Sequence, residues 1–479
     1  MGNLADDTRW LDALDQAALV ARGEVTPLEL VDAAIERIEA GNDAINAVVM
    51  KWYDHARERA AGVLPDGPFR GVPFLLKDLF AFLPGTQLTN GSRLFGRFDC
   101  TFESTLVARL RAAGLVVFGK TAAPELGVNV TTEPVLHGPT RNPWDPTRSA
   151  GGSSGGAAVA VAAGILPMAH GGDGGGSIRI PASACGLVGL KPSRARNPIG
   201  PVVGEAWNGL VAGHVLSRSV RDTALALDAT AGPEPGDPYA CPPIAGSFAA
   251  AAGRDPQPLR IGFVTSLPGG SPVEGACIAA TEAAARKLQD LGHHLEELML
   301  PLDAQRLRRT METIVAVNLA RDLDFWAETL GRPADHTAVE TCTWLLAGRG
   351  RRVRATEYGR AITTLHQTSR QLGQVFGRHD LILTPTLGTL PPPLGLLDQN
   401  MDDLDRFLEL NATFIPFTPL YNMTGCPAIS LPLEQSPDGM PIGVMLGAAL
   451  GREDLLLAVA GQLERAHPWF DRVPPERAA

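Results

Sequence analysis

Basic charge, long apolar runs and grouped cysteines are all scarce in this 479-residue sequence. Lys and Arg number 42 against 52 Asp and Glu, which gives a formal net charge of −10. A nucleic-acid-binding surface needs a concentrated basic footprint. The only basic run, residues 349–360, is more typical of a solvated helix face. We therefore expect no nucleic-acid partner.

No apolar stretch approaches the roughly 18 to 20 residues that a transmembrane helix needs. The first twenty residues contain early aspartates and no basic segment before an apolar run, so they do not resemble a secretory signal. The six cysteines form no CxxC pair and no group with histidines, which disfavours both a zinc site and a disulfide framework. Together these absences predict a cytoplasmic protein with reduced thiols, no metal and no membrane association.

The apolar residues that are present follow helical and strand patterns in alternation. Hydrophobic residues make up 45% of the sequence, enough for a large core. Residues 26–41 predict a helix that opens with a Thr-Pro pair and a capping box. Apolar residues 72–76 and 115–121 predict buried strands, the first of which ends at Lys77. This alternation predicts an α/β layered fold.

The second half of the sequence predicts a long helical insertion between strands. A loop rich in Pro, Gly and Ala covers residues 232–260, and a mainly helical segment covers residues 271–377. Apolar runs that return to the sheet are found at residues 259–267, 380–386, 427–433 and 440–450.

Two short motifs match known patterns but lack the necessary context. Residues 114–121 match the P-loop pattern, yet their four variable positions are apolar and predict a strand, so nucleotide binding is not expected. Residues 151–155 match the nucleophile elbow of α/β-hydrolases, but a proline-containing loop precedes them instead of a strand. A Ser-His-Asp hydrolase and a non-enzymatic binding protein remain as alternatives.

Two clusters of glycine and serine stand out, SAGGSSGG at residues 149–156 and GGDGGGSIRIP at residues 171–181. Glycine is used where the backbone takes an unusual conformation or closely approaches another group. Either cluster alone is typical of a tight turn. Together with Lys77 at the end of an upstream strand, they resemble the amidase signature family. The resemblance extends over nearly the whole chain and includes the segments GVPFLLKD, GPTRNPW, CGLVGLKPS and PFTPLYNMTGCPAISLP.

The resemblance implies a fold and a domain organisation. It implies an α/β amidase signature fold, a mixed twisted β-sheet covered by α-helices on both faces. It also implies a single amidase domain over residues 1–479. Within this domain we expect a signature core at about 65–225, a variable and mainly helical region at about 271–400, and a return to the sheet at about 401–470.

The resemblance also assigns roles to residues. Lys77 would be the base, Ser153 the bridging serine and Ser177 the nucleophile. In the enzymes that this sequence resembles, the peptide bond between residues 152 and 153 is cis. This geometry points Ser153 between the lysine and the nucleophile, so we expect the Ser177 hydroxyl within hydrogen-bond reach of Ser153.

The remaining site residues surround the nucleophile. Backbone N–H groups of Gly174, Gly175, Gly176 and Ser177 would form an oxyanion hole. Supporting roles would fall to Ser154, Asp173 and Arg179, which orient the loop without transferring protons. The sequence departs from the usual family pattern on both sides of the aspartate, where Gly172 and Gly174 replace Thr or branched residues.

A lysine can act as a base only when it is neutral. Lys77 follows an apolar run, so we expect burial to lower its pKa from the usual value of about 10.4. The adjacent Asp78 need not hold the proton on the lysine, because neighbouring strand residues point to opposite faces.

The activity implied is that of a cofactor-free amidase with an acyl-serine intermediate and a small-molecule amide substrate. Within the family the sequence looks most like hydrolases that open nylon-derived cyclic amides. Candidate substrates are cyclic or linear ω-amino acid oligomers, aryl or alkyl acylamides, and carbamates. An amidotransferase subunit is an alternative of another class, and a homodimer is left open.

Overall fold

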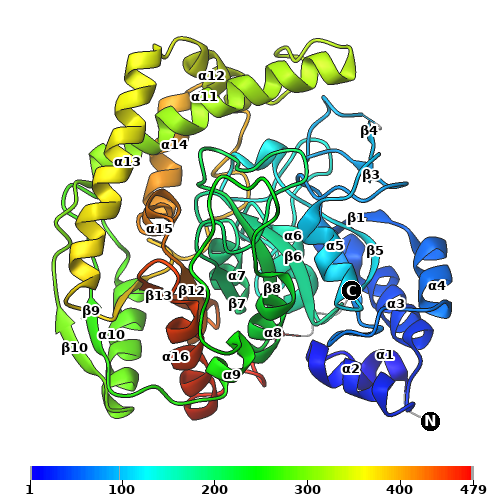
Figure 1. Ribbon diagram of the computed structural model, residues 1–479. Helices are drawn as coiled ribbons and strands as arrows, with labels where there is room; N and C mark the ends of the chain where they lie inside the picture. The colour runs from blue at the N-terminus through cyan, green and yellow to red at the C-terminus, as the bar shows by residue number, and fades with distance from the viewer. Residues whose placement is uncertain (1–2, 97, 476–479) are drawn as a thin grey trace.

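A mixed eight-stranded β-sheet forms the centre of the molecule in the computed structural model, which describes residues 3–96 and 98–475 (Figure 1). The strand order is β10-β9-β11-β13-β12-β7-β8-β6. β9 pairs in parallel with β10 and β11, and the remaining neighbours are antiparallel. The strands are β6 (Met168–Asp173), β7 (Val188–Lys191), β8 (Ala212–Ser217), β9 (Arg260–Phe263), β10 (His294–Glu297), β11 (Leu381–Pro385), β12 (Ala428–Gln435) and β13 (Pro441–Ala448).

A smaller sheet of three strands lies beside the large one. Its order is β1-β5-β2, with β5 antiparallel to β1 and parallel to β2. The last residue of β2, Lys77, contacts the carbonyl oxygen of Gly172 in β6, so the two sheets meet at this lysine. The strands of the small sheet are β1 (Val48–Lys51), β2 (Pro73–Lys77) and β5 (Val116–Thr121), and a separate pair is formed by β3 (Gln87–Leu88) and β4 (Phe98–Asp99).

Helices cover both faces of the large sheet, because side chains along its central strands alternate between two apolar cores. Leu381 and Leu383 of β11 pack with α8, α9, α10 and α16, whereas Ile382 packs with α11, α13 and α15 on the other face. The predicted α/β architecture is confirmed. These helices are α8 (Val220–Thr230), α9 (Phe248–Ala252), α10 (Gly275–Asp290), α11 (Ala304–Leu330), α13 (Ala355–Phe376), α15 (Thr418–Thr424) and α16 (Glu453–Ala466).

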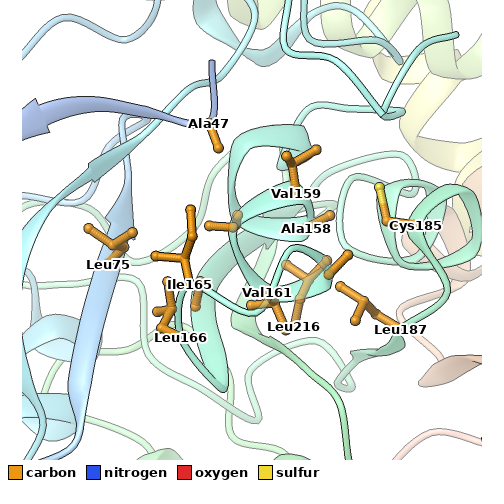
Figure 2. Close-up of a cluster of buried hydrophobic side chains, with 14 of the residues drawn as sticks. Ala47, Leu75, Ala158, Val159, Val161, Ile165, Leu166, Cys185, Leu187 and Leu216 are labelled. Carbon is orange, nitrogen blue, oxygen red and sulfur yellow. The ribbon is translucent and has the colours of Figure 1, made fainter. Parts of the chain in front are cut away.

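A third core surrounds two short helices that follow the glycine and serine clusters. Every residue of α6 (Gly155–Ala162) and of α7 (Arg179–Cys185) is buried. Figure 2 shows Val159 and Val161 of α6 among side chains from β2 and β8. Each cluster therefore continues directly into a helix that is buried in this core.

The other helices lie at the periphery and in the helical insertion. They are α1 (Leu4–Asp7), α2 (Ala13–Ala21), α3 (Pro27–Ile45), α4 (Tyr53–Ala61), α5 (Thr105–Ala112), the 3₁₀ turn η1 (Glu125–Gly127), α12 (Thr341–Arg351) and α14 (Leu404–Phe414). Across residues 3–96 and 98–475, none of the helices combines the length and apolar character needed to span a bilayer.

Several predicted elements differ in extent from the observed ones. The helix predicted over residues 26–41 has the expected capping box but continues to Ile45, where Asn46 adopts a left-handed conformation and ends it. The predicted loop 232–260 contains the helix α9, which begins after the side-chain cap of Ser247. The helical insertion contains strand β10, which pairs with β9 at the end of the strand order. The P-loop pattern at residues 114–121 contains the buried strand β5, as predicted.

Candidate active site

Lys77 is completely buried at the end of β2 and lies next to Ser153. Its Nζ donates hydrogen bonds to Ser153 Oγ at 2.7 Å and to the carbonyl oxygen of Gly172 at 3.2 Å. Burial lowers the pKa of Lys77 to about 7, although the Asp173 carboxylate acts in the opposite direction. The predicted lowering of the Lys77 pKa is confirmed. Near neutral pH, a large fraction of the protein molecules therefore has this lysine in its neutral form.

Asp78 is also buried but makes its contacts elsewhere. It accepts hydrogen bonds from the backbone and the hydroxyl of Thr89, and it lies 3.8 Å from Lys120 Nζ. In the described part of the chain it forms no ion pair with Lys77, in agreement with the prediction from strand geometry. The lysine therefore keeps its lowered pKa despite the neighbouring carboxylate.

Ser153 is buried in the first glycine and serine cluster, and the Gly152–Ser153 peptide bond is cis, as expected. The backbone of Thr131 approaches Gly152 so closely that a Cβ there would lie 2.4 Å from the Thr131 carbonyl oxygen. Only glycine fits this contact. The glycine thus lets the chain pass Thr131 and place Ser153 against the lysine.

Ser154 links the first cluster to the second. Its hydroxyl contacts both the N–H and the carbonyl of Gly172, and its backbone N–H donates to the carbonyl of Ser177 at 3.2 Å. Ser177 lies two residues before α7 and is 8% exposed. Among the described residues, however, no hydrogen bond joins the Ser177 hydroxyl to Ser153. The expected contact between the two hydroxyls is absent, and Ser153 Oγ accepts from Lys77 instead.

The loop between β6 and α7 presents backbone N–H groups on the side of Ser177. Within residues 3–96 and 98–475, the N–H groups of Gly174, Gly175 and Ser177 have no hydrogen-bond acceptor. The N–H of Gly176 donates to Asp173 Oδ1 at 2.7 Å. The Gly176 N–H, expected to be an oxyanion donor, is thus already hydrogen-bonded to the aspartate in this structure.

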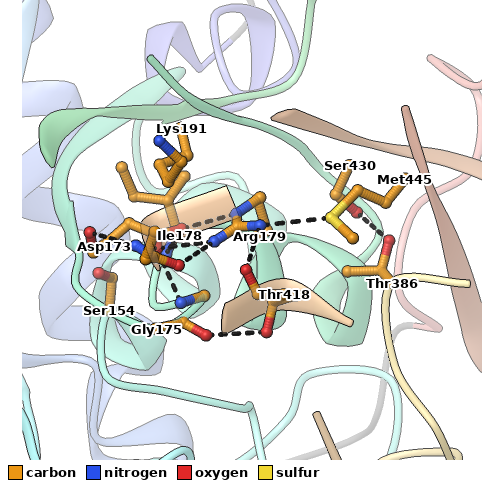
Figure 3. A network of polar contacts seen from close by, with 12 residues as sticks. Ser154, Asp173, Gly175, Ile178, Arg179, Lys191, Thr386, Thr418, Ser430 and Met445 are labelled. Carbon is orange, nitrogen blue, oxygen red and sulfur yellow. Dashed lines mark hydrogen bonds and ion pairs between the residues drawn. The ribbon is translucent and has the colours of Figure 1, made fainter. Parts of the chain in front are cut away.

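Asp173 and Arg179 form a fully buried bidentate ion pair (Figure 3). Nε and Nη2 of the arginine each donate to one carboxylate oxygen at 2.9 Å. Burial by itself raises the pKa of Asp173, but attraction from Arg179 outweighs it, and the pKa falls to about 2. The carboxylate therefore stays ionised and holds the loop through Gly176.

Two residues of α15 complete this network, and sequence reasoning assigned them no role. Asn422 donates to Asp173 Oδ1 at 2.8 Å and accepts from Arg179 at 2.7 Å. The Thr418 hydroxyl donates to the carbonyl of Gly175 at 2.8 Å. Both lie in the segment PFTPLYNMTG, which contributed to the family resemblance as a pattern without individual functions.

His170 is the histidine adjacent to this site. Its Nδ1 accepts a 3.4 Å hydrogen bond from the backbone N–H of Lys77, and no described histidine contacts Ser153 or Ser177. Burial, together with the nearby lysine charge, lowers the pKa of His170 to about 3. The ring thus remains neutral and does not occupy the position of a base, which disfavours the Ser-His alternative.

A cavity of about 780 Å³ lies on the side of Met311, and neither the glycine loop nor Lys77, Ser153 or Ser177 is among its lining residues. Its wall includes residues of α11, α14 and α15, and Met311 of α11 reaches Gly175, where a Cβ would lie 3.4 Å from Met311 Cε. Charged side chains in the wall pair with each other, as in Arg406 with Glu409 at 2.9 Å. The volume is in the range typical of small-molecule sites.

No group of three or more His, Cys, Asp or Glu side chains in the described residues has the arrangement of a metal site. The polar groups gathered around Lys77 are hydroxyls, backbone amides, one ion pair and the neutral ring of His170. These groups are suited to proton transfer and to stabilising a negatively charged oxygen.

Comparison with known proteins gives a consistent assignment. Residues 29–457 match the family model described as Amidase. The chain is 40% identical to the 6-aminohexanoate-cyclic-dimer hydrolase of Paenarthrobacter ureafaciens over 97% of this chain and 96% of that protein. Among solved structures, a 6-aminohexanoate cyclic dimer hydrolase complexed with substrate superimposes with a TM-score of 0.92 at 39% identity, covering 97% of this chain and 99% of that one.

A second structural neighbour has a different stated activity. A bacterial aryl acylamidase of the amidase signature enzymes family has a TM-score of 0.90 at 28% identity and covers 99% of this chain and 100% of that one. The family match, the sequence identity and the shared architecture agree with one another. The chain therefore belongs to the amidase family and is an amide-cleaving hydrolase.

Proposed function

We propose that this enzyme hydrolyses unactivated secondary amides through an acyl-serine intermediate. Ser177 is the nucleophile, Ser153 relays its proton and Lys77 is the base. The observation that carries the proposal is the 2.7 Å hydrogen bond between a completely buried lysine, whose pKa is lowered to about 7, and Ser153 Oγ. A neutral amine at this position can accept a proton through the serine.

In the first half of the reaction, Ser177 Oγ attacks the amide carbonyl carbon. Its proton passes to Ser153 Oγ while the Ser153 proton passes to Lys77 Nζ. The N–H groups of Gly174, Gly175 and Ser177 stabilise the negative charge on the carbonyl oxygen. One such donor typically contributes about 3 kcal/mol to the transition state. Lys77 then returns the proton through the relay to the leaving nitrogen, and the C–N bond breaks.

In the second half, water attacks the acyl-serine ester. The same relay removes a proton from the water and returns one to Ser177 Oγ, which releases the carboxylic acid and restores the enzyme. The described structure contains no hydrogen bond between the Ser177 hydroxyl and Ser153. In the proposed mechanism this hydrogen bond forms when substrate binds. Catalytic hydrogen bonds often tighten only in such complexes. The backbone contact between Ser154 and Ser177 keeps the two segments adjacent.

The substrate class that we propose is a cyclic or linear oligomer of an ω-amino acid. The relative at 40% identity is a 6-aminohexanoate-cyclic-dimer hydrolase, which supports this class. Met311, which reaches Gly175, also lines a cavity of about 780 Å³ that could admit the rest of such a chain. The aryl acylamidase at 28% identity supports aryl acylamides as the second candidate class.

A substrate panel read by mass spectrometry tests the proposal. It contains the cyclic and linear 6-aminohexanoate dimers, an anilide, a primary amide and a carbamate. We expect the purified chain alone to cleave at least one secondary amide, with Ser177→Ala inactive and EDTA without effect. Loss of turnover in EDTA would contradict the metal-free mechanism. Failure to cleave any amide without partner subunits would favour the amidotransferase alternative.

A further inference from the structure

The side chain of Trp207 occupies the space beside Gly174 in the candidate oxyanion loop. A Cβ on Gly174 would lie 3.0 Å from Cζ3 and 3.1 Å from Cε3 of the indole, with Val211 Cγ2 next at 3.3 Å. The φ of Gly174 lies outside the left-handed region, so its backbone does not itself demand glycine. The glycine is needed because the tryptophan packs directly against the backbone.

The other glycine that flanks Asp173 provides a contrast. A Cβ on Gly172 would meet no atom within 4 Å. Both positions depart from the usual family pattern, but of the two only Gly174 has a described side chain where an added Cβ would lie. The tryptophan therefore explains the departure at Gly174 and not the one at Gly172.

The backbone that carries Trp207 is held in an uncommon conformation. Trp207 and Asn208 have φ values of 49° and 55°, which non-glycine residues rarely adopt in succession. Asn208 Oδ1 accepts hydrogen bonds from Asn318 Nδ2 of α11, at 3.1 Å, and from the Tyr358 hydroxyl of α13. Two helices of the insertion thus fix the position of the indole.

The same segment is tied to the ion pair beneath the loop. Asn422 Nδ2 donates to the carbonyl of Leu210 at 3.0 Å and also to Asp173 Oδ1 at 2.8 Å. The Trp207 segment and the glycine loop are therefore held by one common side chain. The contact between Trp207 and Gly174 is built into the network and is not an incidental packing of a surface residue.

Met311 extends the apolar surface along the loop. Its Cε lies beside Gly175, and both Met311 and Trp207 are partly buried against the same two apolar clusters. Apolar side chains thus line the loop at Gly174 and Gly175, two of the three residues whose free N–H groups face the reacting carbonyl in the proposed mechanism. The space at Gly172 is open.

We propose that Trp207 is a specificity-determining residue, an inference that rests on the proposed function. Its ring limits the space beside the oxyanion donors, so that the substrate carbonyl reaches Gly174 and Gly175 only when the adjacent carbon carries no branch. The preferred substrates are then amides with an unbranched methylene chain next to the scissile carbonyl. Linear and cyclic ω-amino acid oligomers have this property, and α-branched acyl groups lack it.

An acyl series on one amine measures this selectivity. The amine is that of whichever secondary amide the enzyme cleaves, and the acyl groups are hexanoyl, 2-methylhexanoyl and benzoyl. We expect the wild type to prefer hexanoyl by at least tenfold in kcat/KM. Trp207→Ala should reduce this preference at least tenfold, mainly by increasing kcat/KM for the branched acyl group, and Trp207→Phe should give an intermediate ratio.

Trp344→Ala is the matched control, because Trp344 packs against the same apolar cluster but lies beside His336 and Arg351. Its selectivity should equal that of the wild type. An equal fall for all acyl groups in Trp207→Ala, or the same loss of preference in Trp344→Ala, would overturn the proposal. A wild type that cleaves no amide would overturn the proposed function instead.

A double-mutant cycle tests the contact without relying on substrate choice. Gly174→Ala should lower the melting temperature because its Cβ meets the indole, and adding Trp207→Ala should recover part of that loss. Gly172→Ala should cause a smaller decrease, since its Cβ meets open space. Fully additive changes in melting temperature for Gly174→Ala and Trp207→Ala would show that the two residues do not interact and would overturn the proposal.

Discussion

Lys77 Nζ and Ser153 Oγ lie 2.7 Å apart, and both side chains are buried. A buried ammonium that faces a neutral hydroxyl has little to compensate for its lost hydration, so its proton is held weakly. Asp173 provides the nearby negative charge, but its carboxylate is committed to Arg179. The serine thus contacts a lysine that can lose its proton near neutral pH.

The pH dependence of catalysis follows from this contact. Because the base must be neutral, kcat/KM should increase with pH along an acid limb with an apparent pKa near the value of about 7 for Lys77. Below this pKa the rate should fall about tenfold per pH unit, since one proton inactivates the site. A pH profile of kcat/KM from pH 5 to 9 measures the limb.

A histidine substitution is the control for this profile. His170→Asn should keep the acid limb, because the ring of His170 is neutral over this range and accepts its hydrogen bond from the backbone N–H of Lys77, not from the lysine amine. If the limb disappeared in His170→Asn while Lys77→Ala remained active near pH 7, a Ser-His mechanism would replace the one proposed.

The three proposed catalytic side chains should behave as one unit. Lys77→Ala and Ser177→Ala should each reduce kcat by several orders of magnitude, with Ser153→Ala between them or equal to them. The double variant Lys77→Ala/Ser153→Ala should lose little more than the worse single variant, because residues that act together are not additive. Effects that multiply would show that Lys77 and Ser153 act independently, in conflict with the relay.

Covalent labelling identifies the nucleophile directly. A fluorophosphonate should modify one serine, and peptide mass spectrometry should locate the label at Ser177, which lies next to the free N–H groups of Gly174 and Gly175. Labelling in Ser177→Ala at the wild-type rate would place the nucleophile elsewhere.

The ion pair beneath the loop should contribute to stability as well as to geometry. Arg179→Met leaves Asp173 buried without its partner, and breaking a buried pair in this way typically costs about 3 to 5 kcal/mol. Urea unfolding at pH 7 measures the loss. Arg22→Met, which breaks the exposed pair with Glu24, is the control and should leave the unfolding midpoint unchanged.

The same pair predicts the behaviour of the fold in acid. The pKa of Asp173 is about 2 in the folded protein, below the value of about 3.9 in an unfolded chain. Its stabilising contribution is complete above the unfolded pKa and is lost as the pH falls toward 2. Asp173→Asn should therefore show a smaller decrease in stability between pH 5 and pH 2 than the wild type, as measured by urea unfolding.

Local sequence patterns were sufficient for several features of the site. The apolar run before Lys77 predicted a buried strand that ends at this lysine, and burial of an amine lowers its pKa wherever the strand is placed. The strand within the P-loop pattern was also predicted from local sequence, because the four variable residues of the pattern are all apolar. Each of these predictions depends only on residues that are adjacent in the sequence.

The direction of individual backbone groups depended on the tertiary structure. The glycines around Ser177 indicated a close approach, but not that Asp173 would accept from Gly176 and leave three other N–H groups free. Nor did they indicate the absence of a hydrogen bond between Ser153 and Ser177. The hydrogen-bond partners of these groups change with small rotations about the backbone dihedral angles of the loop. Glycine allows many such rotations, so the glycines alone do not select one arrangement.

The sequence by itself therefore determined the family architecture, the burial of Lys77 and the identity of the residues that come together around it. Only the tertiary structure decided what touches the glycine loop from outside. Trp207 reaches Gly174, and Asn422 reaches Asp173, from segments about 30 and 250 positions away. No local pattern encodes these contacts, because each joins the glycine loop to a separate segment of the chain, and the packing of those segments sets which glycine has open space and which does not.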